Sequence, residues 1–188
     1  MRKTLRSLRL KKIITMTNKS LVFISGFMGA GKSTHGKQLA KELGYHFIDL
    51  DSYIETKYDK SIVDVFQELG EEEFRKLETM TLTDCIENNI KTVIALGGGT
   101  PCFNNNAELL LKNGLLIYLK MEPKILYTRL EKAKFTRPLL EGKQKQELEN
   151  YITDLLNQRE LFYKQAQLIV DGSNIDMNEL KKSVLEKI

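Results

Sequence analysis

Short apolar runs alternate along the chain with longer segments in which apolar residues recur every three or four positions. Five runs have the length of buried strands: residues 21–24, 45–50, 92–96, 115–119 and 167–170. Helical spacing is found in residues 32–43, 62–69, 71–88 and 174–187, and Pro123 is typical of the first turn of another helix. Because strands alternate with helices, the pattern predicts an α/β fold with a parallel sheet covered on both faces.

Glycine-rich and acidic segments follow the first three of these expected strands. Residues 26–33 follow the first strand, Asp49 and Asp51 stand at the end of the second, and a run of three glycines at 97–99 follows the third. Ligands of parallel sheets bind beyond the carboxyl ends of the strands. We therefore expect these three segments to meet in one crevice.

One stretch departs from the pattern. Residues 132–150 contain few apolar residues and many charges, and they include Arg137 followed by Pro138. We expect an insertion here that lies outside the core.

The segment from Gly26 to Ser33 carries the most specific motif of the chain. It reads Gly-Phe-Met-Gly-Ala-Gly-Lys-Ser and matches G-x-x-x-x-G-K-[ST] in full, between an expected strand and an expected helix. Inward-turned backbone N–H groups and the helix N-terminus bind phosphate oxygens in such loops. We expect Lys32 to reach the β- and γ-phosphates of ATP and the Ser33 hydroxyl to bind Mg²⁺. The motif does not identify the phosphate acceptor.

Two groups of side chains are candidates for an acceptor site. Asp49 and Asp51 are predicted to point to opposite faces of their strand, one toward Mg²⁺ and its waters and the other toward the acceptor; alternatively they are solvated carboxylates, with Asp51 capping the next helix. Arg75 and Glu78 are three residues apart on an expected helix and can form one polar cluster. A weak surface ion pair is the alternative for this pair.

The remaining candidates are the triple glycine and two arginines. The glycines permit close approach of the backbone to a ligand, and a loose loop is the alternative. A planar guanidinium can hold a carboxylate or a phosphate with two hydrogen bonds. Arg137 can reach a site only if its polar insertion closes as a lid. Arg159 lies on an expected helix, for which a solvated helix face is the alternative.

Charge and composition exclude several classes of function. The 188 residues have a net charge of +4, but residues 1–15 carry six Lys and Arg and no acid. Removing these six from 29 basic residues leaves 23, against 25 acidic residues. We therefore expect no nucleic-acid partner for the folded part. No apolar run approaches the roughly 20 residues of a membrane helix, and the two cysteines lack metal or redox spacing.

The basic N-terminal segment has three interpretations. It can be disordered, with Met16 as an internal start, or form an arm that contacts a partner, or act as a targeting segment. It lacks the continuous apolar region of a secretory signal. We expect residues 1–17 to be an extension and residues 18–188 to form a single domain.

Together these motifs resemble the shikimate kinase family from about Lys19 to the C-terminus. The resemblance rests on the order and spacing of six short segments: residues 26–34, 49–51, 70–75 with Glu78, 97–99, 137–140 and 159–163. It implies a P-loop fold of the nucleoside-monophosphate-kinase type, with a five-stranded parallel sheet in the order 2-3-1-4-5, flanking helices and a mobile lid at about residues 132–146. The family's adenine-stacking arginine has no certain counterpart, and Arg129 is the nearest candidate.

The resemblance also implies an activity, which is transfer of the γ-phosphoryl group of ATP to the 3-hydroxyl of shikimate. The enzyme would be a cytoplasmic monomer in the pathway to chorismate and aromatic amino acids. Lys32, Asp51 and Arg137 would be catalytic, Glu78 would orient Arg75, and Ser33 and, through water, Asp49 would hold Mg²⁺. The residues that would bind ATP are Gly29, Ala30, Gly31, Lys32, Ser33, Thr34 and Arg137. Those that would bind shikimate are Asp51, Arg75, Gly97, Gly98, Gly99 and Arg159, with the two arginines on its carboxylate and Asp51 on its hydroxyls.

Two alternatives remain open at this point. One is another small-molecule kinase on the same fold, acting on gluconate or a nucleoside monophosphate. The other is a non-catalytic nucleotide-binding domain with a regulatory role. Paired arginines beside Asp51 favour an acceptor that carries both a carboxylate and hydroxyl groups.

Overall fold

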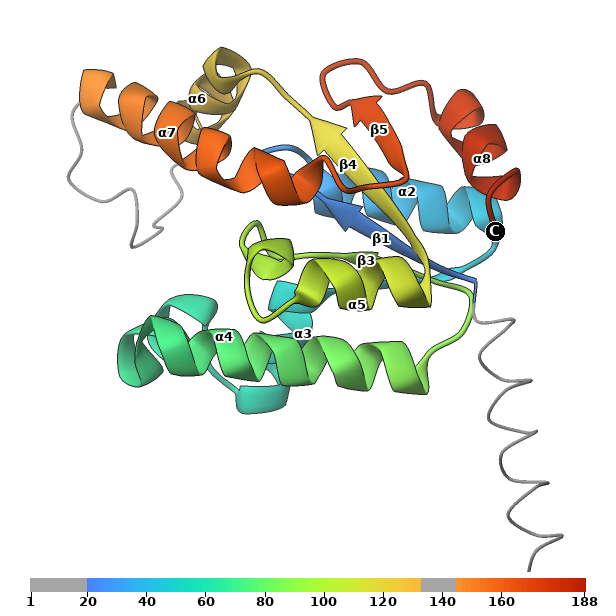
Figure 1. Ribbon diagram of the computed structural model, residues 1–188, viewed down its shortest axis with the longest axis horizontal. Helices are drawn as coiled ribbons and strands as arrows, with labels where there is room; N and C mark the ends of the chain where they lie inside the picture. The colour runs from blue at the N-terminus through green and yellow to red at the C-terminus, as the bar shows by residue number, and fades with distance from the viewer. Residues whose placement is uncertain (1–19, 133–144) are drawn as a thin grey trace, which may run out of the picture.

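Five parallel strands form a single sheet in the computed structural model, which describes residues 20–132 and 145–188 (Figure 1). Their spatial order is β2-β3-β1-β4-β5, and every neighbouring pair is parallel. This confirms the predicted fold class and strand order. The strands are β1 (Leu21–Ser25), β2 (His46–Asp49), β3 (Thr92–Ala95), β4 (Leu115–Lys120) and β5 (Leu168–Asp171).

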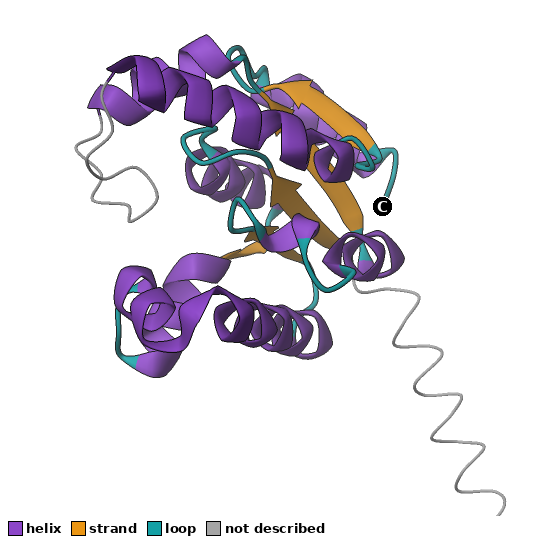
Figure 2. Cartoon of the chain, turned by 60° about the vertical axis from the view of Figure 1, so that its left-hand side comes forward, coloured by secondary structure: helices purple, strands orange, loops and turns teal. Residues whose placement is uncertain are grey.

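Helices cover both faces of the sheet, as Figure 2 shows by secondary structure. They are α2 (Lys32–Leu43), α3 (Leu50–Tyr58), α4 (Ile62–Asn88), α5 (Asn106–Asn113), α6 (Pro123–Lys132), α7 (Lys145–Tyr163) and α8 (Met177–Leu185), with a short 3-10 helix, η1 (Thr100–Cys102). Within the described ranges, no helix combines the length and the apolar character needed to cross a bilayer.

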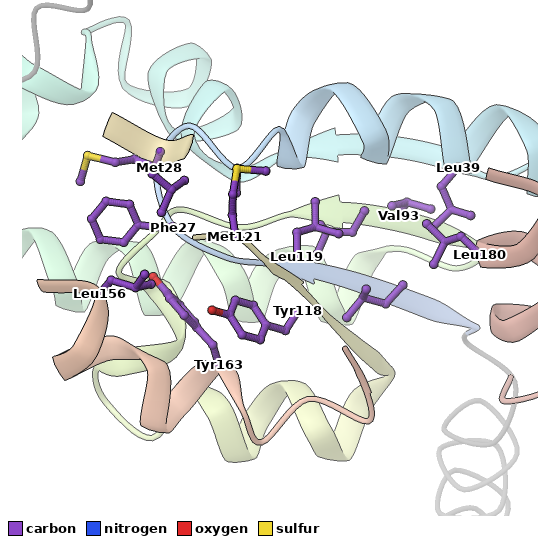
Figure 3. Packing of buried hydrophobic residues seen from close by; sticks show 14 of the residues in the cluster. Phe27, Met28, Leu39, Val93, Tyr118, Leu119, Met121, Leu156, Tyr163 and Leu180 are labelled. Carbon is purple, nitrogen blue, oxygen red and sulfur yellow. The ribbon is translucent and has the colours of Figure 1, made fainter. Parts of the chain in front are cut away.

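The central strand explains the layered core. All five residues of β1 are buried, because alternate side chains face opposite sides of a sheet that is covered on both. Val22 and Ile24 pack in one apolar cluster with residues of α2, α6, α7 and α8 (Figure 3). Leu21 and Phe23 pack in a second cluster with residues of α3, α4 and α5. The edge strands β2 and β5 are only partly buried.

Glycines end or break two helices where the sequence predicts. Gly44 caps α2 with a φ of 67°. Gly70, with φ 74° and ψ 170°, interrupts α4 and divides it into the two helical segments expected at 62–69 and 71–88. The kink is important for the site, since Phe66 before it and Arg75 and Glu78 after it line the same cavity.

Three expectations about local structure are wrong or incomplete. Residues 50–58 form α3, and its N-cap is Asp49, whose Oδ1 accepts a hydrogen bond from the Ser52 N–H at 3.3 Å, so Asp51 is not the cap. The sequence pattern did not predict α3, α5 or η1. The C-terminal boundary expected for the insertion at 132–150 is also wrong. Helix α7 begins at Lys145, and Leu148 packs against the core.

Candidate functional site

The loop between β1 and α2 has the geometry of a phosphate cradle. Gly29 and Gly31 have φ values of 80° and 89°, a region that residues with side chains rarely adopt. Lys32 Nζ donates a hydrogen bond to the Phe27 carbonyl at 3.0 Å, which holds the lysine along the loop. Helix α2 begins at Lys32 and has no acidic residue in its first turn. Its positive N-terminal end therefore favours an anion at this position.

Ser33 and Asp49 bring two oxygen ligands together beside this loop. The Ser33 hydroxyl in the first turn of α2 donates a short hydrogen bond to Asp49 Oδ2 at the end of β2. Mg²⁺ prefers oxygen ligands and is usually held by one or two protein groups together with substrate phosphates and water. The pair is therefore chemically suited to Mg²⁺.

Asp51 lies in the first turn of α3 and is half-buried. The expectation that strand alternation separates it from Asp49 is wrong, because residues two apart on a strand share a face and because β2 ends at Asp49. The turn into α3 separates the two carboxylates instead. A Cβ atom on Gly97 would lie 2.9 Å from Asp51 Oδ1, which places Asp51 directly against the loop after β3.

Arg75 and Glu78 on α4 form a buried ion pair. Arg75 Nη1 donates to Glu78 Oε2 at 3.0 Å, and the two residues are 8% and 1% exposed. The alternative of a surface ion pair is therefore wrong. Burial raises the pKa of the Glu78 carboxyl, while Arg75 and Thr100 oppose this shift. A buried carboxylate at this position requires its partners, since an unpaired charge in the interior is costly.

The triple glycine forms a close-packed wall, so the alternative of a loose loop is wrong. A Cβ atom on Gly99 would lie 2.8 Å from Arg75 Nη2, and one on Gly98 would lie 3.5 Å from Arg159 Nη1. The Tyr163 hydroxyl donates a short hydrogen bond to the Gly98 carbonyl. Figure 3 shows Tyr163 beside Tyr118, at a ring-centroid distance of 5.1 Å.

Replacing Gly99 with alanine is expected to raise the Michaelis constant for the acceptor by about tenfold, because displacing Arg75 costs at least one charged hydrogen bond. The backbone tolerates alanine, since Gly99 has ordinary helical dihedrals, φ −93° and ψ −17°. The three atoms nearest to the new methyl group would all belong to the Arg75 guanidinium, at 2.8–2.9 Å. Steady-state kinetics check this prediction, with an unchanged Michaelis constant for ATP as the internal control. An equal rise for both substrates would contradict it.

Arg159 on α7 is also buried and points to the same wall. It is 8% exposed, so the alternative of a solvated helix face is wrong. Its guanidinium carbon lies 5.9 Å from the ring centroid of Phe27 in the phosphate loop. Arg159 comes from α7, which packs on one face of the sheet, whereas Arg75 comes from α4, which packs on the other face.

These groups surround one cavity of about 470 Å³. The phosphate loop contributes Met28 and Ser33, while α3 and α4 form the facing wall. Apolar side chains on both sides of the Gly70 kink, which the sequence argument did not identify, also line it; the ring centroids of Phe66 and Phe74 lie 5.3 Å apart. The lining residues proposed from the sequence are Ser33, Asp49, Asp51, Arg75, Glu78, Gly97, Gly98, Gly99 and Arg159.

Arg137 and most of the expected lid lie outside the described residues. Of the lid at 132–146, Lys132 is the last residue of α6, and Lys145 and Gln146 open α7. Arg129 on α6 donates to the Gly29 carbonyl at 3.3 Å, so it borders the phosphate loop.

The cavity has the chemistry of a site for two anionic ligands. Met28 and Ser33, the loop residues that flank the glycine cradle, line it together with two buried guanidinium groups and the carboxylate of Asp51, whereas Gly29, Gly31 and Lys32 are not among the lining residues. Arginine pairs hold carboxylates through parallel hydrogen bonds, and a carboxylate accepts hydrogen bonds from hydroxyl groups. The arrangement can therefore place a hydroxylated acid opposite a nucleotide phosphate.

Comparisons with known proteins agree with this geometry. The sequence model of the shikimate kinase family matches residues 28–188. A shikimate kinase from Azobacteroides pseudotrichonymphae is 41% identical over 167 residues, 89% of this chain and 98% of the relative, and one from Bacteroides fragilis is 43% identical over 164 residues, 87% and 91%.

Solved structures give the same result. The shikimate kinase of Bacteroides thetaiotaomicron superposes with a TM-score of 0.79 at 40% identity, covering 89% of this chain and 94% of that one. The Acinetobacter baumannii enzyme in complex with shikimate gives 0.78 at 32% identity, covering 89% and 91%. A gluconokinase from Sinorhizobium meliloti, at 12% identity and a TM-score of 0.51, shares the fold alone. The chain belongs to the shikimate kinase family.

Proposed function

We propose that the two ends of the cavity bind ATP and shikimate, and that the chain transfers the γ-phosphoryl group to the shikimate 3-hydroxyl. Membership of the family makes the chain an ATP-dependent kinase with an alcohol acceptor. One observation carries the assignment of the acceptor end: Arg75 and Arg159, each only 8% exposed, line the same cavity as Asp51 and the phosphate loop.

Shikimate would lie with its carboxylate between Arg75 and Arg159. Its ring hydroxyls would face Asp51, and the backbone of Gly97, Gly98 and Gly99 would approach the ring closely. The relative from Acinetobacter baumannii that crystallised with shikimate supports this assignment at 32% identity. A buried guanidinium is a strong partner for a carboxylate because the low local dielectric strengthens the interaction.

ATP would bind through the phosphate loop. Gly29, Ala30, Gly31 and Thr34 would contribute backbone N–H groups, and Lys32 would exchange the Phe27 carbonyl for phosphate oxygens. Ser33 and, through water, Asp49 would hold Mg²⁺, which neutralises charge on the β- and γ-phosphates when bound. The hydrogen bond between these two side chains supports that assignment.

Catalysis would depend on positioning and on charge neutralisation more than on a strong base. The shikimate 3-oxygen attacks the γ-phosphorus, the bond from this phosphorus to the bridging oxygen breaks, and ADP departs. Asp51 orients the hydroxyl and accepts its proton. Lys32 and Arg137 stabilise the negative charge that spreads over the transferring group. The lid would exclude water and so suppress hydrolysis of ATP.

The enzyme would act as a monomer in the cytoplasm, with residues 18–188 as one domain and residues 1–17 as an extension. The family places it in the shikimate pathway to aromatic amino acids.

A coupled assay of ADP release tests the acceptor. With Mg-ATP, shikimate is expected to support turnover at a rate far above the background of ATP hydrolysis. Gluconate and nucleoside monophosphates should remain at background. A rate with either of these that equals the rate with shikimate would refute the acceptor assignment, and no acceptor-dependent release at all would favour a non-catalytic domain.

A further inference from the structure

We propose that Thr100 and Phe103, at the η1 segment after the triple glycine, are positioning residues that hold Arg75 in the orientation needed for the acceptor carboxylate. This inference rests on the proposed role of Arg75 and adds residues that do not line the cavity themselves.

Thr100 acts on Arg75 through Glu78. The Thr100 hydroxyl, which is fully buried, donates to Glu78 Oε1 at 2.6 Å, while Arg75 Nη1 donates to the other oxygen, Oε2, at 3.0 Å. Glu78 thus bridges the two residues, with one oxygen for each. Without the hydroxyl, Glu78 Oε1 would lose a short hydrogen bond in the interior, and the carboxylate would be free to rotate away from Arg75.

Phe103 contacts the Arg75 guanidinium with the face of its ring. The Arg75 guanidinium carbon lies 4.4 Å from the Phe103 ring centroid and 5.2 Å from that of Phe74. Both distances are within the range of favourable cation–π contacts. With Gly99 packed against the same group, the rings restrict rotation of the side chain.

Two asparagines connect the segment around η1 to α4 near Arg75 through hydrogen bonds. Asn104 Nδ2 donates to the Arg75 carbonyl at 3.0 Å, and Asn106 Nδ2 donates to the Thr100 carbonyl at 2.9 Å and to Thr79 Oγ1 at 3.1 Å. The positions of Thr100 and Phe103 relative to Arg75 are therefore set by a continuous hydrogen-bond network.

One donor of the buried Arg75 side chain is left unpaired. Its Nε is buried and has no hydrogen-bond partner among the described residues, although Nη1 and Nη2 are paired with Glu78 and Glu71. A buried unpaired donor on a charged side chain is costly. A guanidinium that is free to turn would move Nε toward a partner, so the contacts with Glu78, which Thr100 holds, and with Phe103 are needed to keep the observed orientation.

The test is a set of conservative variants. Thr100→Val, which keeps the shape and removes the hydroxyl, is expected to raise the Michaelis constant for shikimate about tenfold. The Michaelis constant for ATP should change by less than about twofold, and Thr100→Ser should restore wild-type values. Phe103→Leu should raise the constant for shikimate about threefold, and Phe103→Tyr should restore it. Thr92→Val is the matched control, because Thr92 is equally buried but its hydroxyl donates to the Ile90 carbonyl at the far end of β3.

Calorimetric titration with shikimate and with its carboxamide distinguishes a loss of Arg75 orientation from a general loss of order in the binding site. Thr100→Val and Phe103→Leu should weaken shikimate and leave the neutral carboxamide unchanged, and Thr100→Val should add nothing to Arg75→Ala. Equal losses for both ligands, or additive losses with Arg75→Ala, would overturn the positioning role while leaving the proposed function intact. Unchanged shikimate affinity in Arg75→Ala would overturn both. If Thr100→Val fails to fold, the comparison of Phe103→Leu with Phe103→Tyr tests the positioning role.

Discussion

Replacing Lys32 with alanine is expected to lower kcat by about 10³-fold, the scale seen when a preorganised charge or donor is removed from a transferring phosphoryl group. Lys32 opens α2 directly after Gly31 and is held along the phosphate loop by its bond to the Phe27 carbonyl at 3.0 Å. Because alanine favours the helix, the loop should keep its shape. The loss is therefore one of charge at the reacting phosphate, and steady-state kinetics with saturating shikimate measure it.

Lys37→Ala is the matched control for this variant. Lys37 lies on the exposed side of the same helix, where its ammonium contacts the Phe47 ring at 5.8 Å. It should retain wild-type kcat. Wild-type turnover in Lys32→Ala would refute the assignment of the phosphate loop.

Arg159→Ala is expected to weaken shikimate on the order of 10²-fold, since it removes two charged hydrogen bonds in a buried site. ATP affinity should change little, because the proposed partner of Arg159 is the carboxylate of shikimate and not a phosphate. Arg159→Lys should recover only part of the loss, since an ammonium keeps the charge but not the planar pair of donors. Calorimetric titrations of each ligand provide both affinities.

Gln158→Ala serves as the control for Arg159, because Gln158 is the exposed neighbour on α7. It should leave both affinities unchanged. Equal losses of shikimate and ATP in Arg159→Ala would contradict its role as a carboxylate ligand.

Contiguous motifs were predictable from the sequence because their chemistry depends on adjacent residues. The phosphate loop needs glycines with positive φ directly before Lys32, and this requirement is visible in the sequence itself. The strand order followed from the resemblance to the family. Gly70 was recognisable as a break because the apolar helical spacing of residues 62–69 ends there, and its φ of 74° with an extended ψ of 170° confirms the break.

The environment of Arg75 was not predictable from its neighbours on α4. A spacing of three residues on a helix allows an ion pair between Arg75 and Glu78, but it does not show whether this pair is exposed or buried. The outcome depends on η1, a three-residue helix 22 residues beyond Glu78, which covers the pair and supplies Thr100. Such short helices have no periodicity to detect. Helix α3 was missed for a related reason, since only Leu50 and Ile54 of its residues are buried.

A crystal structure with shikimate and a non-hydrolysable ATP analogue tests the two-ended cavity most directly. We predict that the carboxylate lies between Arg75 and Arg159, with the 3-hydroxyl near Asp51 and directed at the γ-phosphate in the loop from Gly26 to Ser33. Shikimate bound outside this cavity, or bound with its carboxylate away from both arginines, would contradict the account.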